Sequence, residues 1–107
     1  RSQGIFYSIY NLRALTMIAD VGERENINIW GYPTNENSKL LLAIKYLTPF
    51  ILGEKNWPYE QISDYDKCSF IPVLESAYSF SKDDFYLEVI NKLQKLGCVE
   101  NYFPPFI

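Results

Sequence analysis

The fold is decided by one stretch, residues 5–19, which read IFYSIYNLRALTMIA. Apolar side chains fall on nearly every side of a helix drawn through this stretch, so we expect a helix that is buried all round. Arg13 is the exception, and a buried arginine is costly unless it is paired. It could lie on the outer edge, form an ion pair or contact an anionic ligand. Gly22, which follows Asp20 and Val21, suits a left-handed C-cap that ends the helix.

A second helix is expected over residues 39–48, where the apolar side chains recur at helical spacing. Ser38 supplies an N-cap before it. Pro49 must kink or restart this helix, because proline lacks the N–H group that the helix interior needs. Gly53 then ends the apolar segment.

Two more helices complete the expected architecture. One begins near Cys68 or Ser69 and has Pro72 in its first turn. The other follows residues 81–84 (SKDD), which resemble a capping box, and ends at Gly97. Because no alternation of period two persists, the sequence predicts an all-α protein of about four helices, paired as hairpins and joined by long aromatic loops.

Composition excludes several classes of function. The chain has 107 residues, enough for one domain, and a net charge of −3 without a basic cluster, so we do not expect nucleic-acid binding. No apolar run approaches the roughly 20 residues that cross a bilayer, so we expect no membrane partner. Nine tyrosines, seven phenylalanines and two tryptophans suggest a large core together with aromatic surface for sugars, peptides or a missing partner.

The sequence contains no histidine, which removes the usual general base and the usual zinc ligand from this chain. Any catalysis would fall to tyrosine, lysine, aspartate or glutamate, and we expect no metal and no cofactor. Cys68 and Cys98 do not have CxxC spacing. A disulfide and two buried thiols both remain open for this pair.

Candidate chemistry gathers at the start of the chain. Arg1 carries a permanent cation, and Tyr7 carries a phenol that can give or take a proton. In a continuous helix these side chains would project about 120° apart. Gly4 between them favours an extended approach that could point both into one cleft. A half-buried Tyr7 beside a frayed terminus is the alternative.

The connection over residues 23–37 is too rich in turn-forming residues for a long helix and too aromatic for a passive linker. We expect Ile27, Ile29 and Trp30 to pack against the core. A groove-lining role for Trp30 or Tyr32 is the functional alternative.

Several segments together resemble the C-terminal part of the alginate lyase superfamily domain. They are residues 1–12 (RSQGIFYSIYNL), 28–32 (NIWGY), the helix over 40–50 and the loop 53–62 (GEKNWPYEQI). The loop GEKxWPY, with an arginine and a tyrosine six apart upstream, is the most specific element. The likeness is good over residues 1–65 and loose over the fourth helix. It implies that residues 1–107 form the C-terminal part of a domain with an α/α-toroid fold.

The resemblance implies a polysaccharide lyase that cleaves a uronic-acid polymer, of alginate or glucuronan type, by β-elimination. It gives Arg1 the task of neutralising the uronate carboxylate, and Tyr7 the role of acid or base. It also implies a secreted or periplasmic location. The remaining substrate contacts would come from Gln3, Trp30, Tyr32, Trp57 and Tyr59.

The sequence departs from the family pattern in two ways. The family's upstream Asn-His pair is absent, and Phe6 precedes the tyrosine where relatives often have histidine. We therefore expect this chain to hold at most half of a catalytic site, with the rest supplied by a missing N-terminal part of the same domain. Isolated residues 1–107 should then show no lyase activity. The alternative is a non-catalytic helical module that binds carbohydrate or protein.

Overall fold

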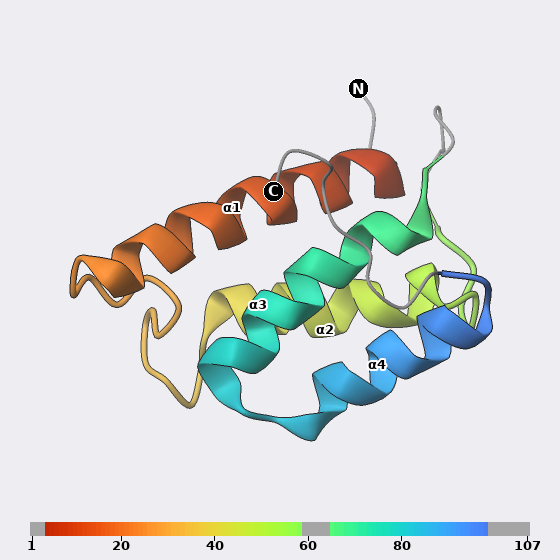
Figure 1. Cartoon of the computed structure of the whole chain (residues 1–107). Coiled ribbons are helices and arrows are strands. Elements are labelled where there is room, and N and C mark those ends of the chain that lie inside the picture. The colour runs from red at the N-terminus through yellow and green to blue at the C-terminus, as the bar shows by residue number, and fades with distance from the viewer. Residues whose placement is uncertain (1–3, 59–64, 99–107) are drawn as a thin grey trace.

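The computed structural model describes residues 4–58 and 65–98 (Figure 1). The described residues form four α-helices and one short 3-10 helix, and they contain no strand. The prediction of an all-α protein with four helices is confirmed, and the toroid remains a prediction. The elements are α1 (Ile5–Arg24), α2 (Lys39–Ile51), η1 (Lys67–Phe70), α3 (Ile71–Ser81) and α4 (Asp84–Lys95).

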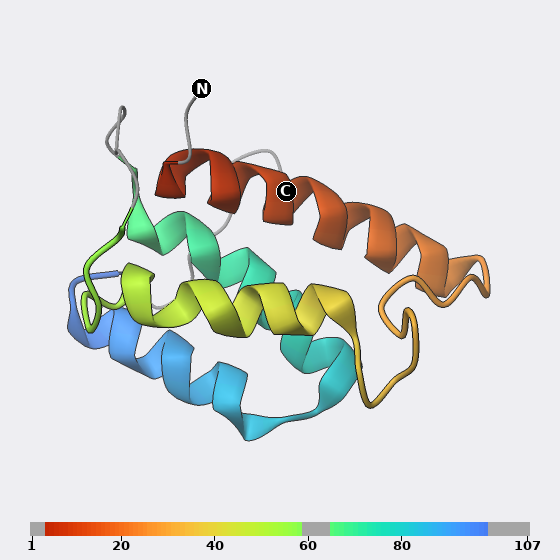
Figure 2. The same cartoon turned by 180° about the vertical axis from the view of Figure 1, so that it is seen from behind.

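Helix α3 is the centre of the bundle, because it packs against α1, α2, α4 and η1. Figure 1 shows α1 along one edge and α4 along the opposite edge, and Figure 2 shows α2 covering α3 from behind. All five helical elements contribute side chains to one core. Its members include Ile9, Ile44, Phe70, Leu74, Tyr86 and Leu93.

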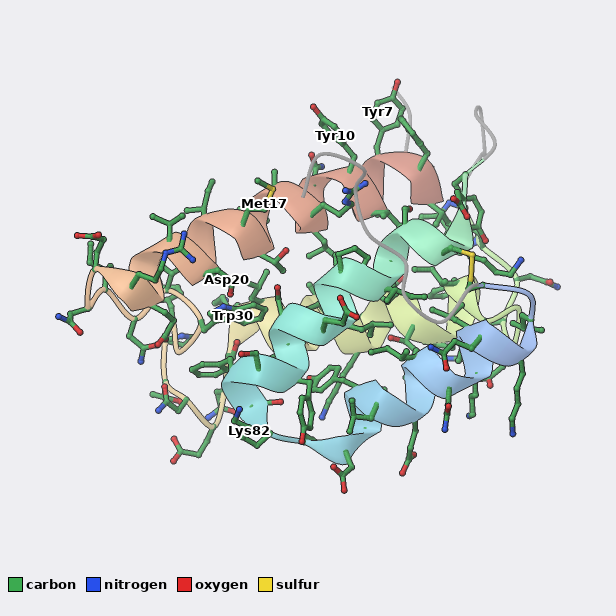
Figure 3. The ribbon with its side chains drawn as sticks, in the orientation of Figure 1. Tyr7, Tyr10, Met17, Asp20, Trp30 and Lys82 are labelled. Atoms are coloured by element: carbon green, nitrogen blue, oxygen red, sulfur yellow. A yellow bond between two sulfur atoms is a disulfide. The ribbon has the colours of Figure 1, made fainter. Side chains whose placement is uncertain are left out.

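Helix α1 has two different apolar faces. Its buried side chains include Ile5, Ile9, Leu12, Thr16 and Ala19, spaced three or four residues apart, so they form a single stripe toward the core. The opposite side is exposed, and Figure 3 shows Tyr7, Tyr10 and Met17 pointing away from the bundle. The prediction of a helix buried all round is therefore wrong for the described residues. An edge helix has neighbours on one side only, and this cannot be read from its own sequence.

The end of α1 also differs from the prediction. The helix continues to Arg24, and Gly22 lies inside it instead of forming a left-handed cap. A Cβ atom at Gly22 would lie 2.7 Å from the Ile27 carbonyl oxygen and 2.9 Å from Ile29 Cδ1. Glycine is needed here because the returning loop approaches the helix backbone closely. The left-handed residue is Asn26, with φ 63°.

Helix α2 begins where the sequence predicts. The Leu41 backbone N–H donates to Ser38 Oγ at 3.1 Å, which is an N-cap hydrogen bond. The helix passes through Pro49 without restarting and ends at Ile51. Gly53 follows in a left-handed conformation, with φ 78°, as expected for a residue that stops a helix.

The second half of the chain is held by two aspartate caps and a disulfide. The Cys68 backbone N–H donates to Asp66 Oδ1 at 2.9 Å, and the Phe85 backbone N–H donates to Asp83 Oδ1 at 3.0 Å. Asp83, and not Ser81, is therefore the cap of α4. Cys68 and Cys98 form a disulfide, which decides between the two alternatives left open by the sequence. The bond joins η1 to the chain just after α4.

Within the described part of the chain, no helix is both long and apolar enough to cross a membrane.

Candidate functional site

Tyr7 lies in the first half of α1 and is accessible. Gly4 precedes the helix in an extended conformation, as the sequence predicts. The Tyr7 side chain is 47% exposed, and the Phe6 ring meets it edge-on with centroids 5.1 Å apart. The Tyr7 phenol can therefore reach a ligand. Arg1 and Gln3 lie outside the described residues, so their relation to Tyr7 stays a prediction.

Tyr7 belongs to an aromatic surface that we call the N-terminal aromatic face, formed by Phe6, Tyr7 and Tyr10. The Phe6 and Tyr10 rings are nearly parallel, at 15°, with centroids 6.4 Å apart. Tyr10 is 64% exposed. Exposed aromatic rings offer flat apolar area together with a polar tip, which suits the mixed surface of a sugar.

A small recess opens between α1 and η1, beside this face. It has a volume of about 50 Å³. Its polar side chains are Arg13 and Tyr10 from α1, Ser69 from η1 and Tyr65 just before η1. Sequence reasoning missed Tyr10, Tyr65 and Ser69. One signal could have found part of this cluster, because Phe6, Tyr10 and Arg13 are spaced i, i+4, i+7 and share one side of a helix.

Trp30 has a structural position. It is completely buried, its indole N–H donates to Asp20 Oδ1 at 2.9 Å, and its ring stacks on Phe80 with centroids 5.6 Å apart. The second Asp20 oxygen accepts from Ser76 Oγ at 2.7 Å. Figure 3 shows Asp20 and Trp30 close together beneath α1. The expectation that Trp30 packs on the core is confirmed, and the expectation that it contacts substrate is corrected, because no ring face is exposed.

Tyr32 lies on the surface near the far end of α1. Its side chain is 63% exposed, and its peptide bond to Pro33 is cis. Ile29 is half-buried as expected, whereas Ile27 is exposed and the prediction that it packs on the core is wrong.

Tyr32 also borders a groove of about 460 Å³ between α1 and α2. The groove is mostly apolar, so it suits another protein segment better than a sugar chain rich in hydroxyl and carboxylate groups. Among the described residues that line the groove, Lys39 is the only one with a basic or acidic side chain. The apolar side chains of this groove are Leu12, Leu15, Ile18, Ile29, Leu40 and Ala43.

Trp57 is half-buried and meets Phe50 edge-on, with ring centroids 5.1 Å apart. Its neighbour Tyr59 lies outside the described residues. Both views place the loop that follows α2 at the same end of the bundle as the start of α1, and the loop that carries Tyr32 at the other end (Figures 1 and 2). The structure thus brings Trp57 to the same end as Tyr7 and separates Tyr32 from both. The two ends are well separated, because α1 has 20 residues and a helix of that length spans about 30 Å.

No cluster of three or more metal-ligating side chains of the His, Cys, Asp or Glu type occurs in residues 4–58 and 65–98.

Comparison with known proteins identifies the family. The model of the alginate lyase family matches residues 1–57, which include α1, α2 and Tyr7. Searches of curated proteins and of solved structures found no match. The matched segment covers 57 of the 107 residues, which is more than half. The chain therefore belongs to the alginate lyase family.

Proposed function

We propose that this chain is part of a polysaccharide lyase that cleaves a uronic-acid polymer, of alginate or glucuronan type, by β-elimination. One observation carries the proposal: the Tyr7 phenol is exposed on an aromatic surface, inside the segment that matches the family. A buried Tyr7 would have had no access to a polymer. Family membership supports a polysaccharide as the substrate.

The chemistry sets the tasks of the two candidate groups. The proton on C5 of a uronate is weakly acidic, because the adjacent carboxylate is already negative. A cation bound to that carboxylate stabilises the charge that develops as the proton leaves, and we assign this task to Arg1. The C4–O bond then breaks, the departing glycosidic oxygen gains a proton, and a C4–C5 double bond forms. Tyr7 takes the C5 proton or protonates the departing oxygen.

The remaining catalytic groups would come from another part of the same domain. The chain has no histidine, so it lacks the second proton-transfer group that the family resemblance implies. Met17, Ile18 and Val21 on α1 are exposed apolar residues, and the groove between α1 and α2 continues this surface. Such a surface supports packing of a further helical segment against α1.

A non-catalytic carbohydrate-binding module is the second candidate. It is favoured by Phe6, which precedes Tyr7 where relatives often have histidine and which cannot transfer a proton. In this alternative, the N-terminal aromatic face binds sugar rings, and the protein binds the polymer without cleaving it.

We also propose a secreted or periplasmic location, because disulfides persist in oxidising compartments and the Cys68–Cys98 pair is oxidised. Secretion of a tagged protein into the medium or periplasm, with no free thiol, is the expected result. A reduced protein retained in the cytoplasm would contradict it.

The lyase proposal is tested by product analysis. Two proteins are incubated with alginate and with glucuronan: the chain of residues 1–107, and the longer protein encoded by the same reading frame. Ultraviolet absorbance reports the double bond conjugated to the carboxylate. We expect unsaturated product from the longer protein and none from the isolated chain. Absence of product from both, with intact binding, would favour the non-catalytic module. Product from the isolated chain would refute a site divided between two segments.

A further inference from the structure

We propose that Arg13 binds the carboxylate of a uronate residue neighbouring the one that is cleaved, in the recess between α1 and η1. This inference rests on the proposed function, because it takes the same class of polymer. Residues Phe6, Ile9 and Tyr10 form the wall of the recess on the α1 side, and Tyr65 and Ser69 form the wall opposite.

Arg13 is half-buried and has no carboxylate partner among the described residues. The ion pairs found there are Lys45 with Asp83 and Lys92 with Glu54, and none of these side chains lines the recess. None of the described residues that line the recess is acidic. A guanidinium carries five N–H donors, and partial burial without an anion is costly. The recess is therefore chemically suited to an anionic ligand.

The size of the recess points to one functional group rather than a whole sugar. Its volume of about 50 Å³ exceeds the 10–15 Å³ or so that a single water needs. A carboxylate can enter with a water, while the sugar ring to which it is attached must remain at the rim. Tyr10 lies at that rim, exposed and stacked on Phe6, so it offers the ring a flat surface.

The opposite wall provides complementary polar groups. The Tyr65 phenol is protonated at neutral pH, as phenols ordinarily are, so it can donate a hydrogen bond. Burial raises the pKa of Tyr65 further above its ordinary value. The Ser69 hydroxyl donates to the Asp66 carbonyl oxygen at 2.6 Å. Its lone pairs then remain to accept a hydrogen bond from a sugar hydroxyl. A carboxylate at Arg13 would thus meet donors from both walls.

The recess also has a suitable position relative to Tyr7. Tyr7, Tyr10 and Arg13 follow one another at intervals of three residues along α1. Each step turns the side chain by about 60° and advances it by about 4.5 Å, so the three form a line that winds toward η1. A polymer that follows this line places one uronate at Tyr7 and a neighbour at Arg13.

The test measures binding, so that it does not depend on cleavage. Tetrasaccharides of mannuronate and of glucuronate, and their carboxyl-reduced neutral forms, are titrated calorimetrically into the 107-residue chain. Arg13→Gln should weaken binding of the better uronate ligand by about 10- to 100-fold, as expected for a lost charge-assisted hydrogen bond. Arg13→Lys keeps the charge without the bidentate fork, so its affinity should lie between that of the original chain and that of Arg13→Gln. The neutral oligosaccharides should bind the original chain and Arg13→Gln equally.

Arg24→Gln is the matched control, since it makes the same change at an exposed arginine in the last turn of the same helix. Its affinity should stay within about twofold of the original. Circular dichroism melts establish that each variant is folded. Equal binding by Arg13→Gln and the original chain, or no binding of any uronate by the original chain, would overturn the inference.

The two proposals fail in different ways. Binding that depends on Arg13, in a longer protein that yields no unsaturated product, would keep this inference and refute the lyase. Cleavage by the longer protein with a KM that Arg13→Gln does not change would keep the lyase and refute the inference.

Discussion

The aromatic side chains near the two ends of α1 differ in exposure and in hydrogen bonding. Near its C-terminal end, Trp30 is fully buried, both its ring and its N–H are occupied, and Asp20 joins it to Ser76 on α3. Near its N-terminal end, Tyr7 and Tyr10 are exposed, and Arg13 has no carboxylate partner among the described residues.

The difference separates a structural role from a functional one. An aromatic residue whose polar atom is satisfied inside the protein has nothing left to offer a ligand. An aromatic residue that keeps an exposed face and an available polar atom costs little in stability and remains free to bind. We infer that the buried stripe anchors α1 along its whole length and that Asp20 and Trp30 strengthen this attachment near the C-terminal end. Tyr7 and Tyr10 are thereby presented on a rigid helix.

The largest effect on the free energy of unfolding should come from removing the buried Trp30 side chain. Trp30→Ala should lower the free energy of unfolding by about 3–5 kcal/mol, because it deletes a fully buried aromatic side chain. The matched control is Tyr32→Ala, which removes an exposed aromatic from the same loop and should cost less than about 0.5 kcal/mol. Urea unfolding followed by circular dichroism measures both. Similar losses for the two variants would contradict the assignment of Trp30 to the core.

Removing the disulfide should have the second largest effect on the free energy of unfolding. Replacing both Cys68 and Cys98 by serine should lower the free energy of unfolding by about 2–4 kcal/mol, because the bond closes a long loop in the unfolded chain. Reduction of the unchanged protein serves as the parallel measurement. The disulfide lies at the Tyr7 end of the bundle, so an unaltered urea midpoint in the double variant would show that this end does not depend on the cross-link.

Removing the Asp20 carboxylate, which joins α1 to the Trp30 loop, should have a smaller effect on the free energy of unfolding. Asp20→Ala leaves the indole N–H without its acceptor inside the core and should cost about 1–3 kcal/mol. Glu23→Ala, at an exposed position of the same helix, is the control and should be nearly neutral. If Asp20→Ala unfolds at the same urea concentration as Glu23→Ala, the attachment near the C-terminal end of α1 does not depend on this hydrogen bond.

The smallest effect at neutral pH is expected at Tyr86. Burial, with a further contribution from the Asp83 charge, raises the pKa of Tyr86 to about 12 from an ordinary value of 10.0. Its hydroxyl has no hydrogen-bond partner among the described residues, so Tyr86→Phe should change stability by less than about 1 kcal/mol at neutral pH.

The same variant should differ from the original at alkaline pH. A raised folded-state pKa means that the stability is fully present below pH 10 and is lost as the pH rises toward about 12. The original protein should therefore lose more stability than Tyr86→Phe over this range, in urea titrations at successive pH values. Parallel curves would contradict the burial of the phenol.

Features set by local chemistry could be predicted from the sequence. Ser38 caps α2 because its hydroxyl can reach the Leu41 N–H, and Gly53 ends the apolar segment because glycine readily adopts positive φ. The exposure of Met17 and Ile18 could not be predicted, since it depends on how many helices surround α1. The role of Gly22 could not be predicted either, because it arises from a loop that returns to the helix later in the chain.

The candidate site was predictable to a similar extent. Tyr7 was identified from its spacing and family resemblance, and the structure adds that it is exposed. The burial of Trp30 depends on Phe80 and Asp20, and the recess at Arg13 depends on η1, so both require long-range packing. Composition could not decide which aromatic residue would be covered.

The most direct test of the central claim is the turnover of Tyr7→Phe in the full-length protein that contains this chain. The variant keeps the ring and removes only the hydroxyl, and Tyr10→Phe provides the matched control on the same face. We predict that Tyr7→Phe lowers kcat on the preferred uronate polymer by at least about 100-fold, with oligosaccharide binding retained, while Tyr10→Phe keeps most of the activity. Cleavage by Tyr7→Phe at the original rate would contradict the account.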